Sequence, residues 1–124
     1  MREVIFDSSF LMAVVERPTT WFEDLTDVLG KFQPIILECV AAELGTLAAK
    51  DGTKARTARV ALELTKNFKR AGCGDAGVDD EIVSAALDRK AAVATADGIL
   101  ASTLGGLHVQ TIGLKSGRVA LRFG

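Results

Sequence analysis

The chain has 124 residues, enough for one hydrophobic core and too few for two, so we expect a single domain spanning 1–124. Hydrophobic residues make up 48% of it and charged residues 25%, which argues against disorder, and a net charge of −1 excludes a generally basic protein that coats nucleic acid. No apolar segment approaches the roughly 20 residues that span a bilayer and no export signal opens the chain, so we expect a cytoplasmic protein without a membrane partner.

Short apolar segments alternate with helical segments along the chain. Apolar strands separated by helices are typical of a parallel sheet covered on both faces, because each crossover between parallel strands needs a helix. We therefore predict an α/β fold whose mostly parallel central sheet has about four to five strands with helices on both faces. The expected elements, in chain order, are strand 3–6, helix 8–16, helix 20–31, strand 34–37, helix 39–50, helix 53–70, a glycine-rich turn, helix 79–90, strand 91–96, helix 98–104, strand 108–112 and strand 118–123.

The C-terminal segment differs from the earlier strands. In GRVALRFG, apolar Val119, Leu121 and Phe123 alternate with Arg118 and Arg122. This period of two residues predicts a half-exposed strand at one edge of the sheet.

Two of the predicted strands run directly into an acid, Asp7 after VIF and Asp97 after AVATA. Carboxyl ends of parallel strands share one edge of the sheet, which is where ligands of α/β proteins bind. Glu43, one turn into helix 39–50, and Asp79, at the start of helix 79–90, can reach the same edge. Carboxylates gathered in this way repel one another unless a cation binds among them, and oxygen ligands suit Mg²⁺ or Mn²⁺. The implied chemistry is hydrolysis of a phosphate ester.

The chain resembles the PIN-domain ribonucleases. The resemblance is carried by VIFDSSFLMA, ECVAAELGTLA, GVDDEIVSAAL and AVATADGIL, which occur in the family's order and at its approximate spacing. It implies a PIN-like fold in which Asp7, Glu43, Asp79 and Asp97 are catalytic, hold Mg²⁺ or Mn²⁺ and support endonucleolytic cleavage of RNA. It also implies supporting hydroxyl groups beside the first acid and just before the last, here Ser8 and Thr95.

Each of these residues has a simpler interpretation. Asp7 and Asp97 are also good helix N-caps. Asp79 is followed by Asp80, which is the reserve ligand, and by Glu81, and acids at this position favour a helix N-terminus in any case. Glu38 competes with Glu43. The Ser8 and Thr95 hydroxyls are also of the kind that bonds local backbone.

Basic residues are concentrated between positions 54 and 70. On a helix over 53–70, the spacing would place four of them on one face, which is either a solvated surface or a contact for the RNA backbone. These candidate RNA-binding residues are Arg56, Arg59, Lys66 and Arg70. Weaker candidates for the same role are Lys115, Arg118 and Arg122.

Other residues that often carry chemistry have structural interpretations. Cys39 and Cys73 form no close-spaced pair, so we expect reduced thiols and no structural zinc. His108, at the start of a predicted strand, has no partner nucleophile. The glycines of AGCGDAG lack the Lys-Ser/Thr of a phosphate-binding loop and predict a turn. Trp21 and Phe22 suit the core or a partner surface.

The leading functional hypothesis is a metal-dependent endoribonuclease, with RNA as its substrate. Within the resembled family, the small size favours a toxin of the VapC type held by an antitoxin protein, and an rRNA-processing nuclease is the alternative. The family also makes a homodimer plausible. From other classes, the chain could be a catalytically silent RNA- or protein-binding module. A receiver domain or a haloacid-dehalogenase-like phosphatase fits poorly, because the first strand lacks an acidic pair and Ser9 stands where the phosphatase needs a second Asp.

Overall fold

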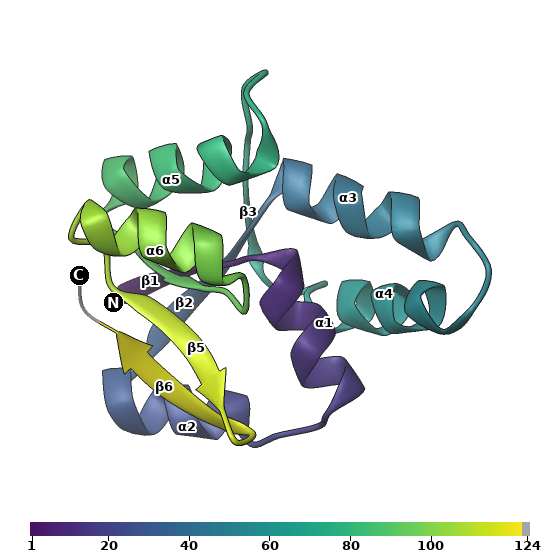
Figure 1. The fold of residues 1–124 in the computed structure, drawn as a ribbon, viewed down its shortest axis with the longest axis horizontal. Helices are drawn as coiled ribbons and strands as arrows, with labels where there is room; N and C mark the ends of the chain where they lie inside the picture. Colours follow the sequence, from purple (N-terminus) through teal and green to yellow (C-terminus); the bar gives the residue numbers. More distant parts are fainter. Residues whose placement is uncertain (123–124) are drawn as a thin grey trace.

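The computed structural model describes residues 1–122 and contains one six-stranded sheet in the order β3-β2-β1-β4-β5-β6 (Figure 1). The strands are β1 (Arg2–Phe6), β2 (Phe32–Leu37), β3 (Lys69–Ala71), β4 (Ala92–Ala94), β5 (Thr111–Lys115) and β6 (Arg118–Arg122). The helices are α1 (Ser8–Glu16), α2 (Trp21–Leu29), α3 (Glu38–Ala48), α4 (Thr53–Leu64), α5 (Val78–Arg89) and α6 (Gly98–Gly106).

The sheet is parallel except at one edge. Ile5 of the central strand β1 lies opposite Ile35 of β2 on one side and Val93 of β4 on the other. β3 and β5 extend the parallel pairing outward, and β6 returns antiparallel to β5. The five parallel strands therefore end at one common edge, which is where the first and last predicted acids lie.

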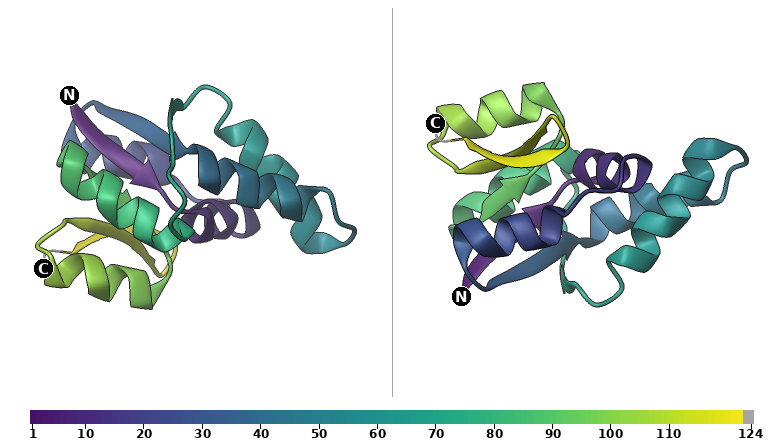
Figure 2. Two further views of the ribbon diagram at one scale, coloured as in Figure 1. Left: turned by 90° about the horizontal axis from the view of Figure 1, so that it is seen from above. Right: turned by 90° about the horizontal axis from the view of Figure 1, so that it is seen from below.

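The chain runs outward from β1 to β3 and then crosses back to β4 and β5. Right-handed crossovers that run in opposite directions along a sheet cover opposite faces. α5 and α6 lie on one face, and α2 lies on the other (Figure 2). α1, α3 and α4 pack against one another beyond the carboxyl edge of β1 and β2 (Figures 1 and 2). The predicted fold class, a mostly parallel sheet with helices on both faces, is confirmed.

Apolar strand residues form the core of the molecule. Val4, Ile5 and Phe6 of β1 are fully buried, as expected for a central strand covered on both faces. The Phe6 ring lies 5.6 Å from Phe10 and 5.5 Å from Trp21. Trp21 is thus a core residue, whereas its neighbour Phe22 is 47% exposed.

The segment after α4 differs from its prediction. The helix expected over 53–70 ends at Leu64, and Lys69–Ala71 forms β3 instead, so the sheet has six strands where we expected four or five. β3 pairs with Ile35, Ile36 and Leu37 of β2, while Phe68 packs against Phe6 at 5.1 Å. These long-range contacts outweigh the helical propensity of the segment, which is all that the sequence pattern reports.

The strand predicted over 108–112 begins later than expected, whereas the last strand begins at the predicted residue. β5 starts at Thr111, because residues 107–110 complete the turn from α6, and His108 adopts a positive φ of 61° in that turn. His108 therefore does not begin a strand. β6 confirms the predicted edge strand up to Arg122, and Phe123 lies outside the described residues. Within residues 1–122, no helix is both long enough and apolar enough to cross a membrane.

The two cysteines are joined in a disulfide, which corrects the expectation of reduced thiols. They are separated by 34 residues in the sequence, but their Cα atoms lie 6.0 Å apart. Cys39 is the second residue of α3, just after β2, and Cys73 follows β3, the neighbour of β2 in the sheet. The pairing depends on strand order, which the spacing of the cysteines does not reveal.

Candidate active site

Asp7 is the central acid of the carboxyl edge. It follows β1 directly, is 5% exposed and donates its backbone N–H to the Ala94 carbonyl of β4 at 2.9 Å. Its Oδ2 accepts hydrogen bonds from the Ser9 hydroxyl at 2.6 Å and the Thr95 hydroxyl at 2.8 Å. Two hydroxyl groups thus hold a buried carboxylate in one orientation, which fits a charged group that acts on a ligand.

Ser9 was not singled out in the sequence, although it bonds Asp7 directly. Its hydroxyl oxygen lies 3.2 Å from that of Thr95 and accepts the Ala96 N–H at 3.0 Å. The Thr95 hydroxyl in turn accepts the Asp97 N–H at 3.0 Å. This network joins the ends of β1 and β4. The available signal was the position of Ser9 in the first turn of α1, from which a hydroxyl can return to the preceding N-cap side chain.

Asp97 has the capping role that was its simpler interpretation. Its Oδ1 accepts the N–H groups of Ile99 at 2.9 Å and Leu100 at 3.2 Å, which satisfies the first turn of α6. The residue is only partly buried. Capping through one oxygen fixes the carboxylate at the edge of the sheet and leaves the other oxygen for a ligand.

Glu43 is brought to the site by α3 and held there by α1. The Ser8 hydroxyl donates to its Oε1 at 2.6 Å, so the predicted supporting hydroxyl contacts Glu43 and not Asp7. The competitor Glu38 points elsewhere, because its Oε2 lies 3.7 Å from Arg70 Nη1 in an exposed ion pair. The structure therefore favours Glu43 over Glu38 as the acid that α3 contributes.

Asp79, in the first turn of α5, joins the other acids. The pKa of its carboxyl group is raised above the usual value, first by burial and then by repulsion from Asp7, Asp97, Glu43 and the adjacent Asp80. Repulsion of this kind falls off with the distance between the charges. Asp79 therefore lies within electrostatic reach of Asp7, Glu43 and Asp97, and we call these four residues, with the reserve Asp80, the acid cluster.

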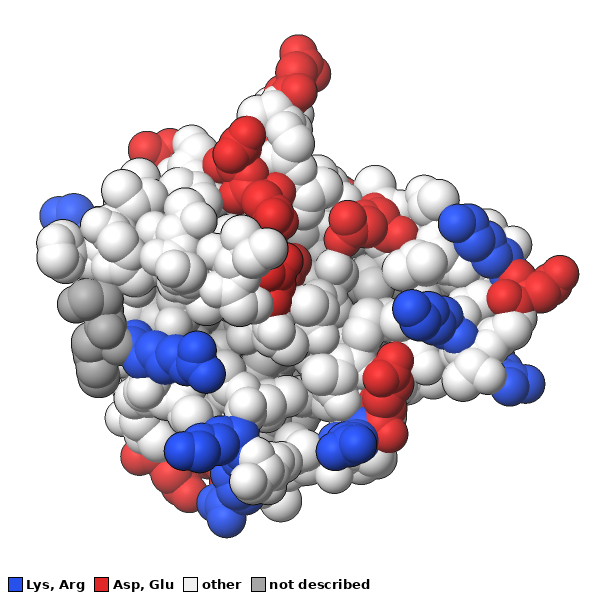
Figure 3. Space-filling view, viewed as in Figure 1, with Lys and Arg blue, Asp and Glu red and all other residues white. Residues whose placement is uncertain are grey.

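Acidic side chains gather between α5, α6 and α3 on the face shown in Figure 3. Lys and Arg side chains lie around this area, over the β5–β6 hairpin and over α4 (Figure 3). The donor set is oxygen only, as Mg²⁺ and Mn²⁺ prefer. Among residues 1–122, however, no three His, Cys, Asp or Glu side chains are drawn together as a ligating group. The chemistry of the donors fits a divalent cation, although the carboxylates are not drawn together as its ligands.

The predicted basic stripe does not form on one helix. Arg59 donates to the carbonyls of Ala48 and Lys50, each at 2.9 Å, and so satisfies the C-terminus of α3. Lys66 follows the end of α4, and Arg70 lies on β3. Arg56 remains exposed on α4. The prediction that these residues share one helical face was wrong, because α4 ends at Leu64. Their contact with RNA stays a prediction.

Two of the basic residues that were candidates for RNA contact pair with acids of the same chain. Lys66 Nζ pairs with Glu63 at 2.6 Å on the surface. Arg118, a weaker candidate for RNA contact, binds Asp24 of α2 through Nε at 2.9 Å and Nη2 at 3.0 Å. It is therefore a structural residue of the β6 edge.

The fold and the acid cluster together indicate the class of protein to which the chain belongs. A family model described as "PIN like domain" matches residues 4–117, and the chain belongs to this family. The resemblance inferred from the four acidic motifs is thereby confirmed. No curated protein matches the chain.

Solved structures share the same architecture. The structure described as "PIN domain endonuclease Utp24" is 27% identical, with a TM-score of 0.82, over 97% of this chain and 90% of that one. A domain from Methanocaldococcus jannaschii of unknown function is 17% identical, with a TM-score of 0.65, over 94% and 93%. A Pyrobaculum aerophilum protein is 16% identical, with a TM-score of 0.56, over 82% and 78%. The last two likenesses concern the fold alone.

Proposed function

We propose that this chain is a Mg²⁺- or Mn²⁺-dependent endoribonuclease that hydrolyses phosphodiester bonds in RNA. The observation that carries the proposal is the arrangement of the acids at one edge of the sheet, where the adjacent Ser8 and Ser9 bond Glu43 and Asp7. In the same place, burial and then the charges of Asp7, Asp97 and Glu43 raise the pKa of Asp79. Membership of the PIN-like family and similarity to a structure described as an endonuclease support it.

A divalent cation held by these acids would compensate their charges, polarise the phosphoryl oxygen and make water a stronger nucleophile. The chain's own contribution is orientation. Ser9 and Thr95 hold Asp7, Ser8 holds Glu43, and the first turn of α6 holds Asp97. Asp79 is exposed at the start of α5, and among residues 1–122 no hydrogen bond holds its carboxylate. Hydrolysis by water needs no nucleophilic side chain, which agrees with the sequence, where His108 has no partner nucleophile.

The hydroxyl groups are positioning residues in this proposal. Ser9 and Thr95 each donate to the same oxygen of Asp7, so the loss of one leaves the other in place. Outer-shell partners of this kind typically contribute about 10- to 100-fold to metal affinity or activity. Removal of an acid itself is expected to cost more.

The test is cleavage of a pool of end-labelled structured RNAs in Mg²⁺, in Mn²⁺ and in EDTA. We expect cleavage only with the metal, and a loss beyond about 100-fold in Asp7→Asn and in Asp79→Asn. Asp88→Asn is the matched control, because Asp88 is also an exposed acid of α5 but lies in the last turn, away from the cluster. Metal-independent cleavage, or equal activity in all three variants, would refute the proposal.

The same experiment separates the alternative functions. A protein that binds RNA in Mg²⁺ but leaves every RNA intact is a silent binding module of the PIN fold. A toxin role requires a small antitoxin that co-purifies with the chain and suppresses cleavage, whereas an rRNA-processing role requires cleavage of precursor RNA at defined positions. Sedimentation of the purified protein tests the expected homodimer.

A further inference from the structure

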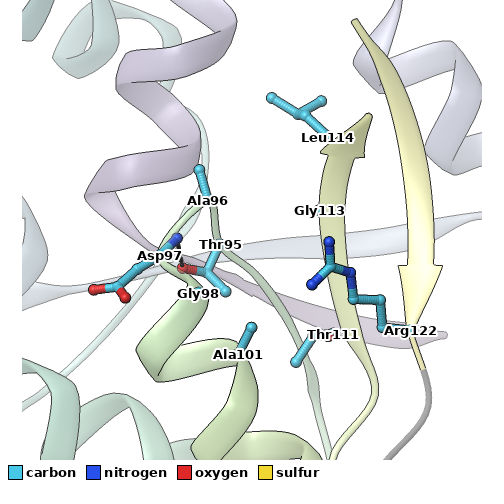
Figure 4. A pocket seen from close by; sticks show the side chains of 9 residues that line it. All are labelled: Thr95, Ala96, Asp97, Gly98, Ala101, Thr111, Gly113, Leu114 and Arg122. Carbon is cyan, nitrogen blue, oxygen red and sulfur yellow. Dashed lines mark hydrogen bonds between the residues drawn. The ribbon is translucent and has the colours of Figure 1, made fainter. Parts of the chain in front are cut away.

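A small hollow lies beside the acid cluster, between the start of α6 and the β5–β6 hairpin. Its volume is about 110 Å³, far more than the roughly 10–15 Å³ that one water needs. Figure 4 shows its lining, with the Arg122 guanidinium on one side and Asp97 on the other. The lining residues used below are Thr95, Asp97, Thr111, Gly113 and Arg122.

We propose that this hollow binds one backbone phosphate of the RNA, with Arg122 as the anchoring residue. The inference rests on the proposed function and extends it, because it places the substrate strand across β5 toward the acids. A guanidinium recognises phosphate through paired N–H donors and keeps its charge at all relevant pH values.

Strand pairing directs Arg122 to this position. Arg122 lies opposite Thr111, and Ala120 opposite Gly113, so these four residues share one face of the hairpin. Gly113 has no side chain, and a Cβ built there would lie 3.9 Å from Arg122 Nε and 3.8 Å from the Thr95 carbonyl. The absent side chain leaves the space across which Arg122 lies. Within residues 1–122, no acid forms an ion pair with Arg122.

Thr111 is a second, independent observation. It is 3% exposed, and its hydroxyl has no hydrogen-bond partner among residues 1–122. Thr111 is also one of the residues that line the hollow. A hydroxyl group on this lining, beside a guanidinium that forms no ion pair among residues 1–122, can donate to an anionic oxygen.

Asp97 is the one acid on this lining, and its charge opposes an anion. Its Oδ1 is already engaged by the N–H groups of Ile99 and Leu100, which offset part of that charge. The arrangement therefore suits a phosphate held on the Arg122 side, with the strand continuing past Asp97 to the cluster.

The test is binding of a fluorescent single-stranded RNA, measured by anisotropy at several salt concentrations in Mg²⁺. All proteins carry Asp7→Asn, so that the RNA is not cut. We expect Arg122→Gln to weaken binding about tenfold and to reduce the log–log salt slope by about 0.7, equally for RNAs of different sequence. Arg122→Lys should keep the slope and lose only part of the affinity.

Two further variants isolate the hollow. Gly113→Val fills the hollow without removing a charge and should therefore weaken RNA binding. The fold should tolerate the substitution, because the added Cβ makes only ordinary contacts. Lys31→Gln removes a positive charge just before β2, at the amino edge of the sheet, and should change little. Unchanged affinity and salt slope in Arg122→Gln, or no RNA binding by any protein, would overturn the subsite. An altered sequence preference with an unchanged slope would assign the hollow to a base and would also overturn it. Normal binding without metal-dependent cleavage in the otherwise wild-type chain would instead refute the nuclease proposal.

Discussion

Asp97 combines two roles that the sequence presented as alternatives. One carboxylate oxygen caps α6 through Ile99 and Leu100, and the residue also contributes to the repulsion felt by Asp79. A cap explains why an acid is tolerated at the end of so apolar a strand. It also orients the charge, so the capping interaction and the proposed ligand role support each other.

Substitutions at Asp97 separate these roles. Asparagine caps a helix about as well as aspartate but carries no charge, whereas alanine neither caps the helix nor carries a charge. We expect Asp97→Asn to abolish metal-dependent cleavage with little change in the free energy of unfolding, and Asp97→Ala to lose cleavage and about 1 kcal/mol. Urea unfolding alongside the RNA assay measures both. Full activity in Asp97→Asn would show that Asp97 is only a cap.

At the scale of elements, the β6 edge is fastened to α2. Arg118 forms a two-point contact with Asp24, which also accepts a hydrogen bond from the Thr20 hydroxyl at 3.0 Å. Asp24 is 8% exposed, and the Arg118 hydrogen bond lowers the pKa of its carboxyl group although burial opposes the shift. This contact holds the hairpin whose last residue is Arg122.

The Asp24 pKa has a consequence for stability against pH. Because the folded pKa lies below the unfolded value of about 3.9, the contribution is complete above that value and is lost as the pH falls through the folded pKa. We expect Asp24→Asn to lower the melting temperature at pH 7 and to reduce the steepness of acid unfolding below about pH 4. Thermal melts from pH 2 to 7 test this, with the exposed Asp51→Asn as control. Parallel melting curves for wild type and Asp24→Asn would contradict it.

The Cys39–Cys73 bond fastens the start of α3 to the segment after β3. It closes a loop with a sequence separation of 34 residues, for which the chain-entropy model gives a stabilisation of about 3–4 kcal/mol. We expect Cys39→Ser and Cys73→Ser to lose similar amounts, and the double variant to lose no more than either one. Urea unfolding with and without dithiothreitol checks this. Wild-type stability that does not respond to reductant would contradict it.

At the scale of the whole molecule, the fold gathers like charges that are far apart in a sequence of nearly balanced charge. The net charge is only −1, yet acids from both ends of the chain meet at one edge of the sheet. The raised pKa of Asp79 means that ionisation of this group disfavours the folded state, so the cost appears as the pH rises through the folded pKa.

This cost predicts how metal and Asp79 affect stability. Without divalent metal at pH 7, Asp79→Asn should melt at a higher temperature than wild type, and the difference should vanish below about pH 3, where the carboxyl group is protonated in both states. Mg²⁺ at 100 times its Kd should stabilise wild type by about 2.7 kcal/mol and the variant by less. Calorimetric melts with Mg²⁺ and with EDTA measure both effects. Equal stabilisation of the two proteins by Mg²⁺ would place the ion elsewhere.

Much of the fold and of the candidate site could be predicted from local pattern. Apolar segments such as Val4–Phe6 between helices are sufficient for a parallel sheet, and parallel strands necessarily end at one edge, which places Asp7 and Asp97 together. The predictions that failed concern features that depend on contacts between residues far apart in the sequence. α4 stops at Leu64 because the following residues pair with β2, and no local pattern reports that pairing.

The sequence by itself therefore indicated the class of fold and the two strand-end acids, because hydrophobic periodicity and strand ends are local properties. The resemblance of its motifs indicated the family and the other two candidate acids. Only the tertiary structure decided that Ser9 holds Asp7, that Cys39 meets Cys73 and that Arg118 binds Asp24 while Arg122 stays beside an open hollow. Each of these outcomes depends on which strands are neighbours and in what register. Strand order and register are set by the packing of the whole core, and not by any one segment.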